Sequence, residues 1–420
     1  MSGSAASYNG IIGANDRLNV GVVGIRSRGR ALTGTVMNAK NTRVSMLCDV
    51  DRNVLEKVRS DVAEKQRKTP QTEKDFRKMI ENKDLDAVVI ASPDHTHTPF
   101  AIYALQAGKH VYVEKPLSHN IEEGGLLVRA AAKYGKVVQV GNQQRSAPTS
   151  IQAMEDIRNG IIGKVHTAKA WYSNARGSIG NGKIVPVPEW LDWDLYQGPA
   201  PRTDYRDNIV HYNWHWFWRW GTGEINNNGL HELDICRWAL GVDIPKKVTS
   251  SGGRYYFDDD WEFYDTQNAI FEFEDNKVIS WEGHSCNNKQ LFDRGRGSLI
   301  YGTEGSILLD RNGYYAFDKS GESIKEILEK EKSATTDIVG AGSLVDYHFD
   351  NFLRGVRDGA KLNSPVSDIN YSNQMCHLGN IAQELGTSIE IDSETGKIKN
   401  NTKANERVGR AYEPGWEPKI

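Results

Sequence analysis

A lysine at the end of a predicted strand is the first residue whose position suggests chemistry. The segment HVYVEKP, His110–Pro116, places Glu114 and Lys115 directly after an apolar run. Proline donates no N–H and fixes its own φ, so the strand is predicted to end at Glu114. Lys115 therefore lies at the carboxyl edge of a sheet, where open α/β folds bind ligands. A lysine there is either an exposed charge or a catalytic cation.

A histidine in a later helix is the second such residue. The pattern predicts a helix over Gly229–Leu240 that Gly241 ends, with His231 and Asp234 on the same side. Histidine titrates near neutral pH and can act as the general base toward a substrate hydroxyl. A lone helical histidine is usually structural, so the spacing alone leaves the role of His231 open.

A glycine-rich turn predicts a phosphate-binding site. The turn follows the apolar run Leu18–Val23 and precedes a helical stretch from Ala31. This order is typical of dinucleotide-binding folds, in which backbone N–H groups and a helix N-terminus hold the pyrophosphate. Arg26 replaces the middle glycine of the motif, so either the loop is displaced or Arg26 contacts the phosphates; alone, the motif fits a plain strand–helix turn equally well. The turn supplies five candidate cofactor residues: Gly24, Arg26, Ser27, Arg28 and Gly29.

An acid at the end of the next strand indicates which dinucleotide binds. Asp49 ends the predicted strand Arg43–Asp49, at the spacing expected for the residue that binds the adenosine ribose hydroxyls. Its carboxylate would repel a 2′-phosphate, which favours NAD over NADP, whereas Arg26 and Arg28 argue weakly the other way. The alternative is that Asp49 caps the helix that begins near Asp51.

Polar residues also follow the strand predicted at Asp86–Ala91. Thr98 is predicted as the N-cap of the next helix, Pro99 as its first residue and Gly108 as the residue after its end. The two histidines of this segment lack the rest of a metal-ligand set, so we predict contacts with the cofactor and no metal site. Four residues are assigned to the cofactor: Ser92, Pro93, Asp94 and His97.

The sequence resembles the Gfo/Idh/MocA oxidoreductases, the glucose–fructose oxidoreductase and inositol dehydrogenase family, over nearly its whole length. The signature region is SPDHTHTPFAIYALQAGKHVYVEKPLS at Ser92–Ser118. Four later segments also match: GNQQR at Gly141–Arg145, NGIIGKV at Asn159–Val165, LDWDLYQGPAP at Leu191–Pro201 and CHLGNIAQELG at Cys376–Gly386.

The resemblance implies roles for particular residues. In such proteins the EKP lysine, here Lys115, lies beside the nicotinamide and the substrate hydroxyl, and His231 matches the catalytic histidine. Family members commonly have an aspartate four residues before that histidine, where this chain has Asn227. An aspartate would raise the histidine pKa, whereas Asn227 can orient a neighbour or the substrate by hydrogen bonding. Further assignments are Glu114 and Gln143 to the cofactor, and Arg145, Tyr172, Trp214 and Asp234 to the substrate.

Tryptophan is concentrated in the middle of the chain. Eight of the eleven tryptophans fall between Trp171 and Trp238, and four alternate in Trp214–Trp220. As a strand, this segment would place all four rings on one face. Most of these rings are expected in the core, and one or two are predicted to line a polyol-binding cleft, because a flat ring with an indole N–H suits sugars.

The length of the chain predicts two domains, because 420 residues are more than a single hydrophobic core usually accommodates. We predict a leader remnant or flexible arm at 1–17 and an α/β Rossmann domain at 18–145. An α+β domain at 146–420 follows, with a large, mostly antiparallel open sheet, helices over Asp346–Gly386 and a polar tail from Lys397 that wraps the surface or another subunit. Its strands are predicted at Val165–Ser173, Lys247–Phe257, Gln267–Glu274, Lys277–His284, Ser298–Gly302 and Ser306–Asp310.

Composition narrows the classes of partner and compartment. The net charge is −3 without blocks of like charge, so nothing favours nucleic acid or a membrane surface, and no apolar stretch approaches a membrane span. The four scattered cysteines suggest neither zinc nor disulfides. A trimmed leader would imply the periplasm, and otherwise the cytoplasm is expected; the resemblance implies a homodimer or homotetramer.

Three functions are compatible with this sequence. The leading hypothesis is NAD-dependent oxidation of a sugar, glycoside or polyol hydroxyl, with His231 as base and Lys115 stabilising the alkoxide. The second is a redox-assisted glycosidase or lyase that recycles its NAD, for which Asn227 leaves room. The third is a non-catalytic sugar sensor, against which the retention of both Lys115 and His231 argues.

Overall fold

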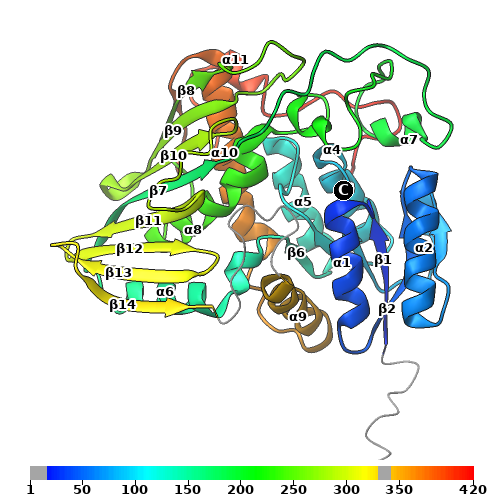
Figure 1. Ribbon diagram of the computed structural model, residues 1–420, viewed down its shortest axis with the longest axis horizontal. Helices are drawn as coiled ribbons and strands as arrows, with labels where there is room; N and C mark the ends of the chain where they lie inside the picture. Colours follow the sequence, from blue (N-terminus) through cyan, green and yellow to red (C-terminus); the bar gives the residue numbers. More distant parts are fainter. Residues whose placement is uncertain (1–16, 330–341) are drawn as a thin grey trace, which may run out of the picture.

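The computed structural model describes residues 17–329 and 342–420, which form a parallel six-stranded sheet beside a mixed nine-stranded sheet (Figure 1). This arrangement confirms the predicted fold class, a Rossmann-type domain followed by an α+β domain with a mostly antiparallel sheet. The predicted arm at 1–17 lies almost wholly outside the described residues.

The parallel sheet is buried on both faces. Alternate residues of its central strands pack into separate clusters, Val20 and Val22 with α1 and α2, and Val88 and Ile90 with α4 and α5. The strand order is β3 (Gln71–Glu73), β2 (Thr42–Cys48), β1 (Leu18–Val23), β4 (Ala87–Ile90), β5 (His110–Val113) and β6 (Val138–Val140). The connecting helices are α1 (Ser27–Asn38), α2 (Arg52–Gln66), α3 (Phe76–Met79), α4 (Asp94–Gln106) and α5 (Ile121–Tyr134). The order reverses between β1 and β4, so their carboxyl ends flank the crevice where such folds bind nucleotides.

Helix α4 begins four residues before the predicted N-cap. Its N-cap is Pro93, so the prediction of Thr98 as N-cap was wrong, and Pro99 lies inside the helix. Proline cannot donate to the carbonyl four residues earlier. Instead, Arg410 of the C-terminal tail donates to that His95 oxygen at 2.5 Å. A partner more than 300 positions away in the chain thus permits a proline that the local pattern placed at the start of the helix.

The second sheet has nine strands, all antiparallel except for the neighbours β7 and β10. The order is β14 (Ser323–Leu328), β13 (Gly313–Asp318), β12 (Gly305–Asp310), β11 (Arg296–Gly302), β7 (Val165–Ser173), β10 (Val278–His284), β9 (Thr266–Glu272), β8 (Lys247–Gly253) and β15 (Ile389–Glu390). Strands β7 to β12 were predicted near their observed bounds. Strands β13 and β14 and the two-residue β15 were not predicted.

Helices cover one face of this sheet. They are α6 (Pro148–Arg158), α8 (Leu230–Leu240) and α10 (Val366–Leu385), and α10 also packs on α5 at the junction of the two sheets (Figure 1). A π-helical turn, Ile225–Gly229, leads into α8. The opposite face exposes Ile270 and Tyr301. Such a face suits a partner subunit, and the homodimer or homotetramer stays a prediction.

The chain returns to the parallel sheet after residue 341. Helix α9 (Gly342–Asp358) packs Phe349 and Phe352 edge-on against Tyr112 of β5, with ring centroids 5.8 Å apart in both pairs. Residues of α9 therefore complete the core of the first sheet, although they fall within the second of the two predicted domains.

The tryptophan-rich segment is not a strand, so the condition under which its four rings would share one face is not met. It forms a short 3-10 turn, Asn213–Trp216, followed by irregular chain. Trp216 stacks on Trp261 with ring centroids 4.0 Å apart, whereas Trp220 packs edge-on against Trp193 of α7 (Trp193–Gln197). Two separate aromatic clusters thus hold the long loop that crosses the top of Figure 1.

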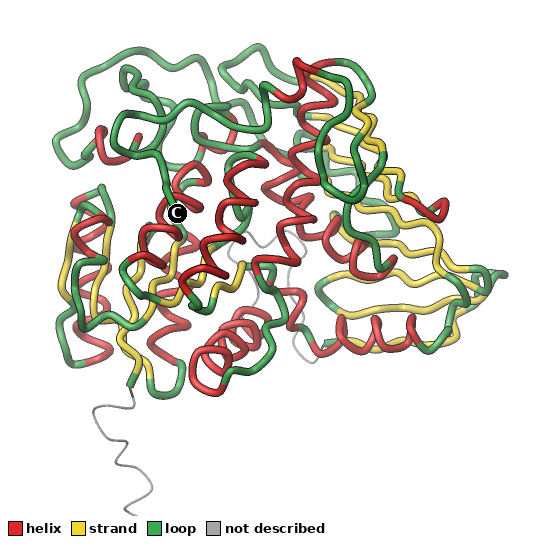
Figure 2. The backbone as a smooth tube through the Cα atoms, turned by 180° about the vertical axis from the view of Figure 1, so that it is seen from behind, coloured by secondary structure: helices red, strands yellow, loops and turns green. Residues whose placement is uncertain are grey.

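The C-terminal tail lies against the first domain. After α11 (Thr402–Asn405) it reaches α4, where Trp416 is buried against Phe100 and Arg77 lies over its ring at 4.0 Å. The Tyr103 hydroxyl donates to the Trp416 carbonyl oxygen at 2.6 Å. Figure 2, seen from behind, shows the chain ending beside the helices of the parallel sheet. The tail therefore covers the surface of its own chain, which is the first of the two predicted alternatives.

Two further features concern membrane and thiol chemistry. Within residues 17–329 and 342–420, no helix is long and apolar enough to cross a membrane. The four cysteines are free thiols, of which Cys286 is half-buried and the other three are buried.

Candidate active site

A cavity of about 460 Å³ opens at the carboxyl ends of the parallel strands and continues under the second domain. Residues from the turns after β1, β2, β4 and β5 form one wall, and loop 174–220, α8 and β11 contribute to the other. Sixteen of the predicted site residues line it: Gly24, Arg26, Ser27, Arg28, Asp49, Ser92, Pro93, Asp94, His97, Glu114, Lys115, Gln143, Tyr172, Trp214, Asn227 and His231.

The glycine turn presents the N-terminus of α1 to this cavity. Helix α1 begins at Ser27, earlier than predicted, and no side chain caps its first turn. Gly24 has φ +71° and lies so close to the next strand that a Cβ would come within 2.6 Å of Ser92. Gly29 lies outside the cavity lining, and its Cβ would lie 1.7 Å from the Gly24 oxygen. Gly29 therefore permits the tight turn, while the uncapped N–H groups suit a pyrophosphate.

Asp49 lies beside this turn and lines the cavity. Its carboxylate accepts from the Ile25 N–H at 2.9 Å and from the Asp51 N–H at 3.0 Å. Burial raises the pKa of Asp49 to about 6. The side chain of Asp51 caps α2 by accepting from the N–H groups of Asn53 and Val54. Asp49 is therefore not the helix cap, and together with the uncapped α1 its acceptor oxygens fit a dinucleotide.

The segment after β4 ties the two walls together. Thr222 donates its hydroxyl to the Asp94 carboxylate at 2.6 Å, and burial raises the pKa of Asp94. The two ring nitrogens of His97 lie 2.7 Å from the carbonyl oxygens of Ser92 and Pro116. These contacts join the loop after β4 to the loop that carries Lys115.

A carboxylate at the end of β5 links three predicted cofactor residues. Arg28 Nε donates to Glu114 Oε1 at 2.8 Å, and Gln143 Nε2 donates to the same oxygen at 2.9 Å. Gln143 also donates to the Tyr112 hydroxyl at 3.0 Å. Glu114 thus positions Arg28 and Gln143 at the cavity wall.

Lys115 is held by Asn227. Its Nζ donates to the Asn227 carbonyl oxygen at 2.6 Å and to the Asn227 Oδ1 at 3.1 Å. Burial lowers the pKa of Lys115 to about 8, although Glu114 and Asp94 act to raise it. Lys115 is therefore mostly protonated at neutral pH and close to its titration range.

His231 faces the same part of the cavity from α8. Burial, together with the positive charges of Lys115 and Arg311, lowers the pKa of His231 well below its ordinary value. A buried imidazole among cations stays neutral at pH 7. The site therefore combines a neutral base with an ammonium group.

Three arginines of the second domain also line the cavity, and none of them was predicted from the sequence. Arg176 pairs with Glu224 at 2.7 Å, and Arg296 is ion-paired to Glu232. Arg311 directly follows β12. Finding them required the strand register and the path of loop 174–220, because each is far from His231 in the sequence. Within residues 17–329 and 342–420, no three His, Cys, Asp or Glu side chains gather as a metal site would require.

Comparison with known families identifies the fold's relatives. Residues 18–142 match the Gfo/Idh/MocA family described as "Oxidoreductase family, NAD-binding Rossmann fold". Residues 196–308 match the GFO/IDH/MocA C-terminal domain. The chain belongs to the Gfo/Idh/MocA family. The match confirms the resemblance seen in the sequence and, with it, the prediction of NAD as the cofactor.

Individual curated proteins match this Gfo/Idh/MocA chain over shorter stretches. Inositol 2-dehydrogenase 2 of Saccharopolyspora erythraea is 26% identical over 270 residues, which are 63% of this chain and 66% of that protein. A glycosyl hydrolase family 109 protein of a Shewanella species is 24% identical over 161 residues, 37% of this chain and 35% of that protein. The chain thus spans between a third and two thirds of these relatives.

A solved structure covers more of the fold. Levoglucosan dehydrogenase in complex with NADH superposes with a TM-score of 0.69 at 17% identity, covering 90% of this chain and all of that one. At this identity the likeness shows the fold, so the substrate has to be argued from the site itself.

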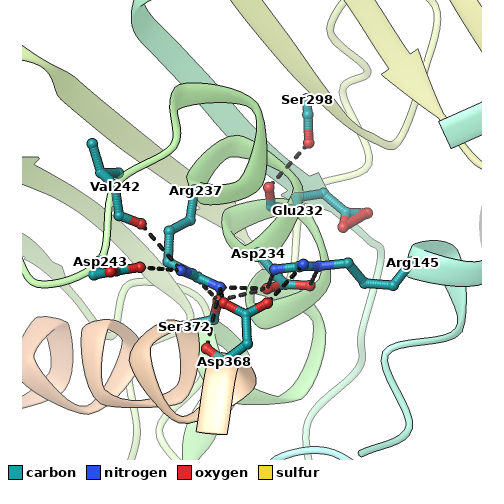
Figure 3. Close-up of polar contacts among 9 residues, drawn as sticks. All are labelled: Arg145, Glu232, Asp234, Arg237, Val242, Asp243, Ser298, Asp368 and Ser372. Atoms are coloured by element: carbon teal, nitrogen blue, oxygen red, sulfur yellow. Dashed lines mark hydrogen bonds and ion pairs between the residues drawn. The ribbon is translucent and has the colours of Figure 1, made fainter. Parts of the chain in front are cut away.

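Two predicted substrate residues of this Gfo/Idh/MocA chain lie outside the cavity lining. Arg145 and Asp234 form a bidentate ion pair, in which both N···O distances are 2.8 Å (Figure 3). Arg145 also pairs with Asp368 at 2.8 Å, and Ser372 donates to Asp234 at 2.6 Å. Because Asp368 and Ser372 belong to α10, this buried network fixes α8 against α10 and positions His231, so we assign Arg145 and Asp234 no contact with substrate.

Proposed function

We propose that this protein is an NAD-dependent oxidoreductase that acts on a hydroxyl group of a sugar, glycoside or polyol. The observation that carries the proposal is that Lys115 and His231 line one cavity with Asp49 and the uncapped N-terminus of α1. A dinucleotide bound by the last two groups would extend along the sheet edge toward Lys115.

Lys115 is assigned the electrostatic role. Asn227 holds its Nζ with two hydrogen bonds, and a pKa of about 8 keeps it protonated at pH 7. An ammonium group in a buried site stabilises the alkoxide that develops when a hydroxyl is deprotonated.

His231 is assigned the role of general base. Its lowered pKa leaves a ring nitrogen available to accept the hydroxyl proton across the neutral range. A buried base of low pKa is weak for an alcohol, so it depends on the adjacent cation to lower the pKa of the substrate hydroxyl.

The cofactor contacts are assigned to three groups of this chain. The turn Gly24–Arg28 would hold the pyrophosphate, Asp49 the adenosine ribose, and the loops after β4 and β5 the nicotinamide half. When bound, NAD supplies the acceptor for the electron pair that leaves the substrate carbon.

The names of related proteins agree with this substrate class. The relatives include an inositol 2-dehydrogenase and, by structure, a levoglucosan dehydrogenase bound to NADH. The glycosyl hydrolase family 109 relative favours a second candidate, a glycosidase or lyase that oxidises its substrate transiently and recycles its NAD. The two candidates differ in whether reduced cofactor accumulates.

A screen of sugars, polyols and aryl glycosides with NAD tests the proposal, with NADH absorbance and released aglycone read together. NADH in proportion to product supports the dehydrogenase, and aglycone without NADH supports the second candidate. Lys115→Met should reduce turnover at least about a hundred-fold, as expected for the loss of a preorganised electrostatic group, while NAD still binds. Lys133→Met, on the exposed face of α5, is the matched control. A fully active Lys115→Met protein would refute the catalytic assignment.

A further inference from the structure

The two walls of the cavity differ in charge. Its carboxylates come from the first domain: Asp49, Asp51, Asp75, Asp94 and Glu114. Among the described lining residues beyond 145 there is no aspartate or glutamate, and there are three arginines, Arg176, Arg296 and Arg311. The half of the cavity away from the glycine turn therefore has a cationic surface.

Two of these arginines come from neighbouring strands in register. Strands β11 and β12 are antiparallel and pair Ser298 with Leu309, so Arg296 and Arg311 lie at the same end of the two strands. Arg296 also lies over the Tyr172 ring at 5.3 Å and donates to Asn228 Oδ1 at 3.1 Å. The sheet thus brings two guanidinium groups to one end of the cavity, beside an aromatic ring.

The nearby acidic groups lie behind this surface. Glu224 and Glu232 pair with Arg176 and Arg296 and are not part of the lining. Position 227, where a carboxylate would counter Lys115, carries an amide. Burial and the charge of Arg296 lower the pKa of Arg311 to about 9, whereas Glu232 acts to raise it.

We propose that the substrate carries an anionic group, a carboxylate or a phosphate ester, that binds between Arg296 and Arg311 while its reacting hydroxyl lies between Lys115 and His231. Planar guanidinium groups bind both kinds of anion through paired hydrogen bonds. The inference rests on the proposed function and specifies its substrate class as sugar acids or sugar phosphates.

Substrate discrimination by the intact protein tests this directly. With NAD present, kcat/KM is compared for neutral sugars, the matching uronic or aldonic acids, and the matching sugar phosphates. At least a ten-fold preference for one anionic series supports the proposal, and the preferred series identifies the anion. Neutral sugars that react as well as both anionic series overturn it and leave the oxidoreductase intact. If no compound reduces NAD or loses an aglycone, then binding to the NAD-loaded protein, followed by tryptophan fluorescence, decides whether anions are preferred.

A charge variant locates the anion site. Arg311→Gln should raise KM for the anionic substrate about ten-fold and change KM for a neutral analogue little, while Arg311→Lys restores part of the preference. Lys319→Gln removes the same charge from an exposed turn of the same sheet and should leave the preference unchanged. An Arg311→Gln protein that is folded by circular dichroism and keeps the full anionic preference would exclude this binding position.

Discussion

At the scale of single residues, the site depends on one amide. Asn227 bonds Lys115 through both its backbone and its side-chain oxygen, and it leaves the ammonium without the carboxylate that commonly stands at this position in the family. The result is a lysine whose pKa is lowered to about 8 beside a histidine whose pKa is also lowered. Burial is the main cause of both shifts, and the neighbouring cations add to it at His231, whereas Glu114 and Asp94 oppose it at Lys115. Neither shift was visible in the residue types alone.

The pH dependence of activity follows from these two groups. Lys115 must be protonated, so kcat/KM should fall as pH rises through about 8, and neutral His231 should give no rising limb near pH 6.5. Asn227→Asp would place a negative charge about 3.1 Å from Nζ, which favours the ammonium form. The falling limb should then move up by roughly one pH unit or more, as carboxylate neighbours commonly shift a pKa.

The pH profile of kcat/KM, recorded with saturating NAD, measures this shift. Asn181→Asp, at an exposed position, is the control and should leave the profile in place. A falling limb that stays near pH 8 in Asn227→Asp would mean that another group controls it.

At the scale of elements, short apolar runs identified the parallel strands and therefore the edge where Lys115, Asp49 and Asp94 meet. The same reasoning failed where a distant partner decides. Pro99 indicated a helix start from the local sequence, but Arg410 donates to the His95 carbonyl oxygen that Pro99 leaves without a partner in the helix. The alternating tryptophans indicated a strand, but their rings pack in two separate clusters. Arg145 and Asp234 suited a substrate by type, yet Arg145, in the 3-10 turn Gln143–Ser146, pairs with Asp234 of α8.

The anchor of the tail on α4 and α5 makes a prediction about stability. Arg410 pairs with Glu123 at 2.6 Å as well as donating to His95, and the Glu123 side chain is fully buried. Removing one partner of a buried pair leaves an uncompensated charge, so Arg410→Met should lower the free energy of unfolding by about 3–5 kcal/mol. Urea unfolding measures this change.

A surface pair and a double variant serve as controls for that measurement. Arg407→Met removes the half-buried partner of the exposed Glu384 and should cost under about 1 kcal/mol. Adding Glu123→Gln to Arg410→Met removes the unpaired charge and should recover part of the loss. Equal stabilities for Arg410→Met and Arg407→Met would contradict the proposed anchoring role.

At the scale of the whole molecule, the C-terminal tail contributes Trp416 to the wall of the cavity, at the end that we propose for the cofactor. Trp416 lines the cavity together with Phe76 and Phe100, on the side where Asp49 lies. It is buried, and Arg77 covers its ring at 4.0 Å. These contacts couple the tail to the parallel-sheet domain and to the proposed cofactor site, although the tail and the first strands come from opposite ends of the sequence.

This coupling predicts that the tail helps to retain the dinucleotide. Trp416→Ala would open the wall beside the adenosine half, so the dissociation constant for NAD should rise about ten-fold, equivalent to about 1.4 kcal/mol. Trp416→Phe keeps an aromatic ring against Phe100 and should retain most of the affinity. Trp218→Ala, at an exposed ring outside the cavity lining, should leave NAD binding unchanged. Titration by fluorescence well below the unfolding temperature separates binding from stability, and an unaltered affinity in a folded Trp416→Ala protein would restrict the tail to a structural role.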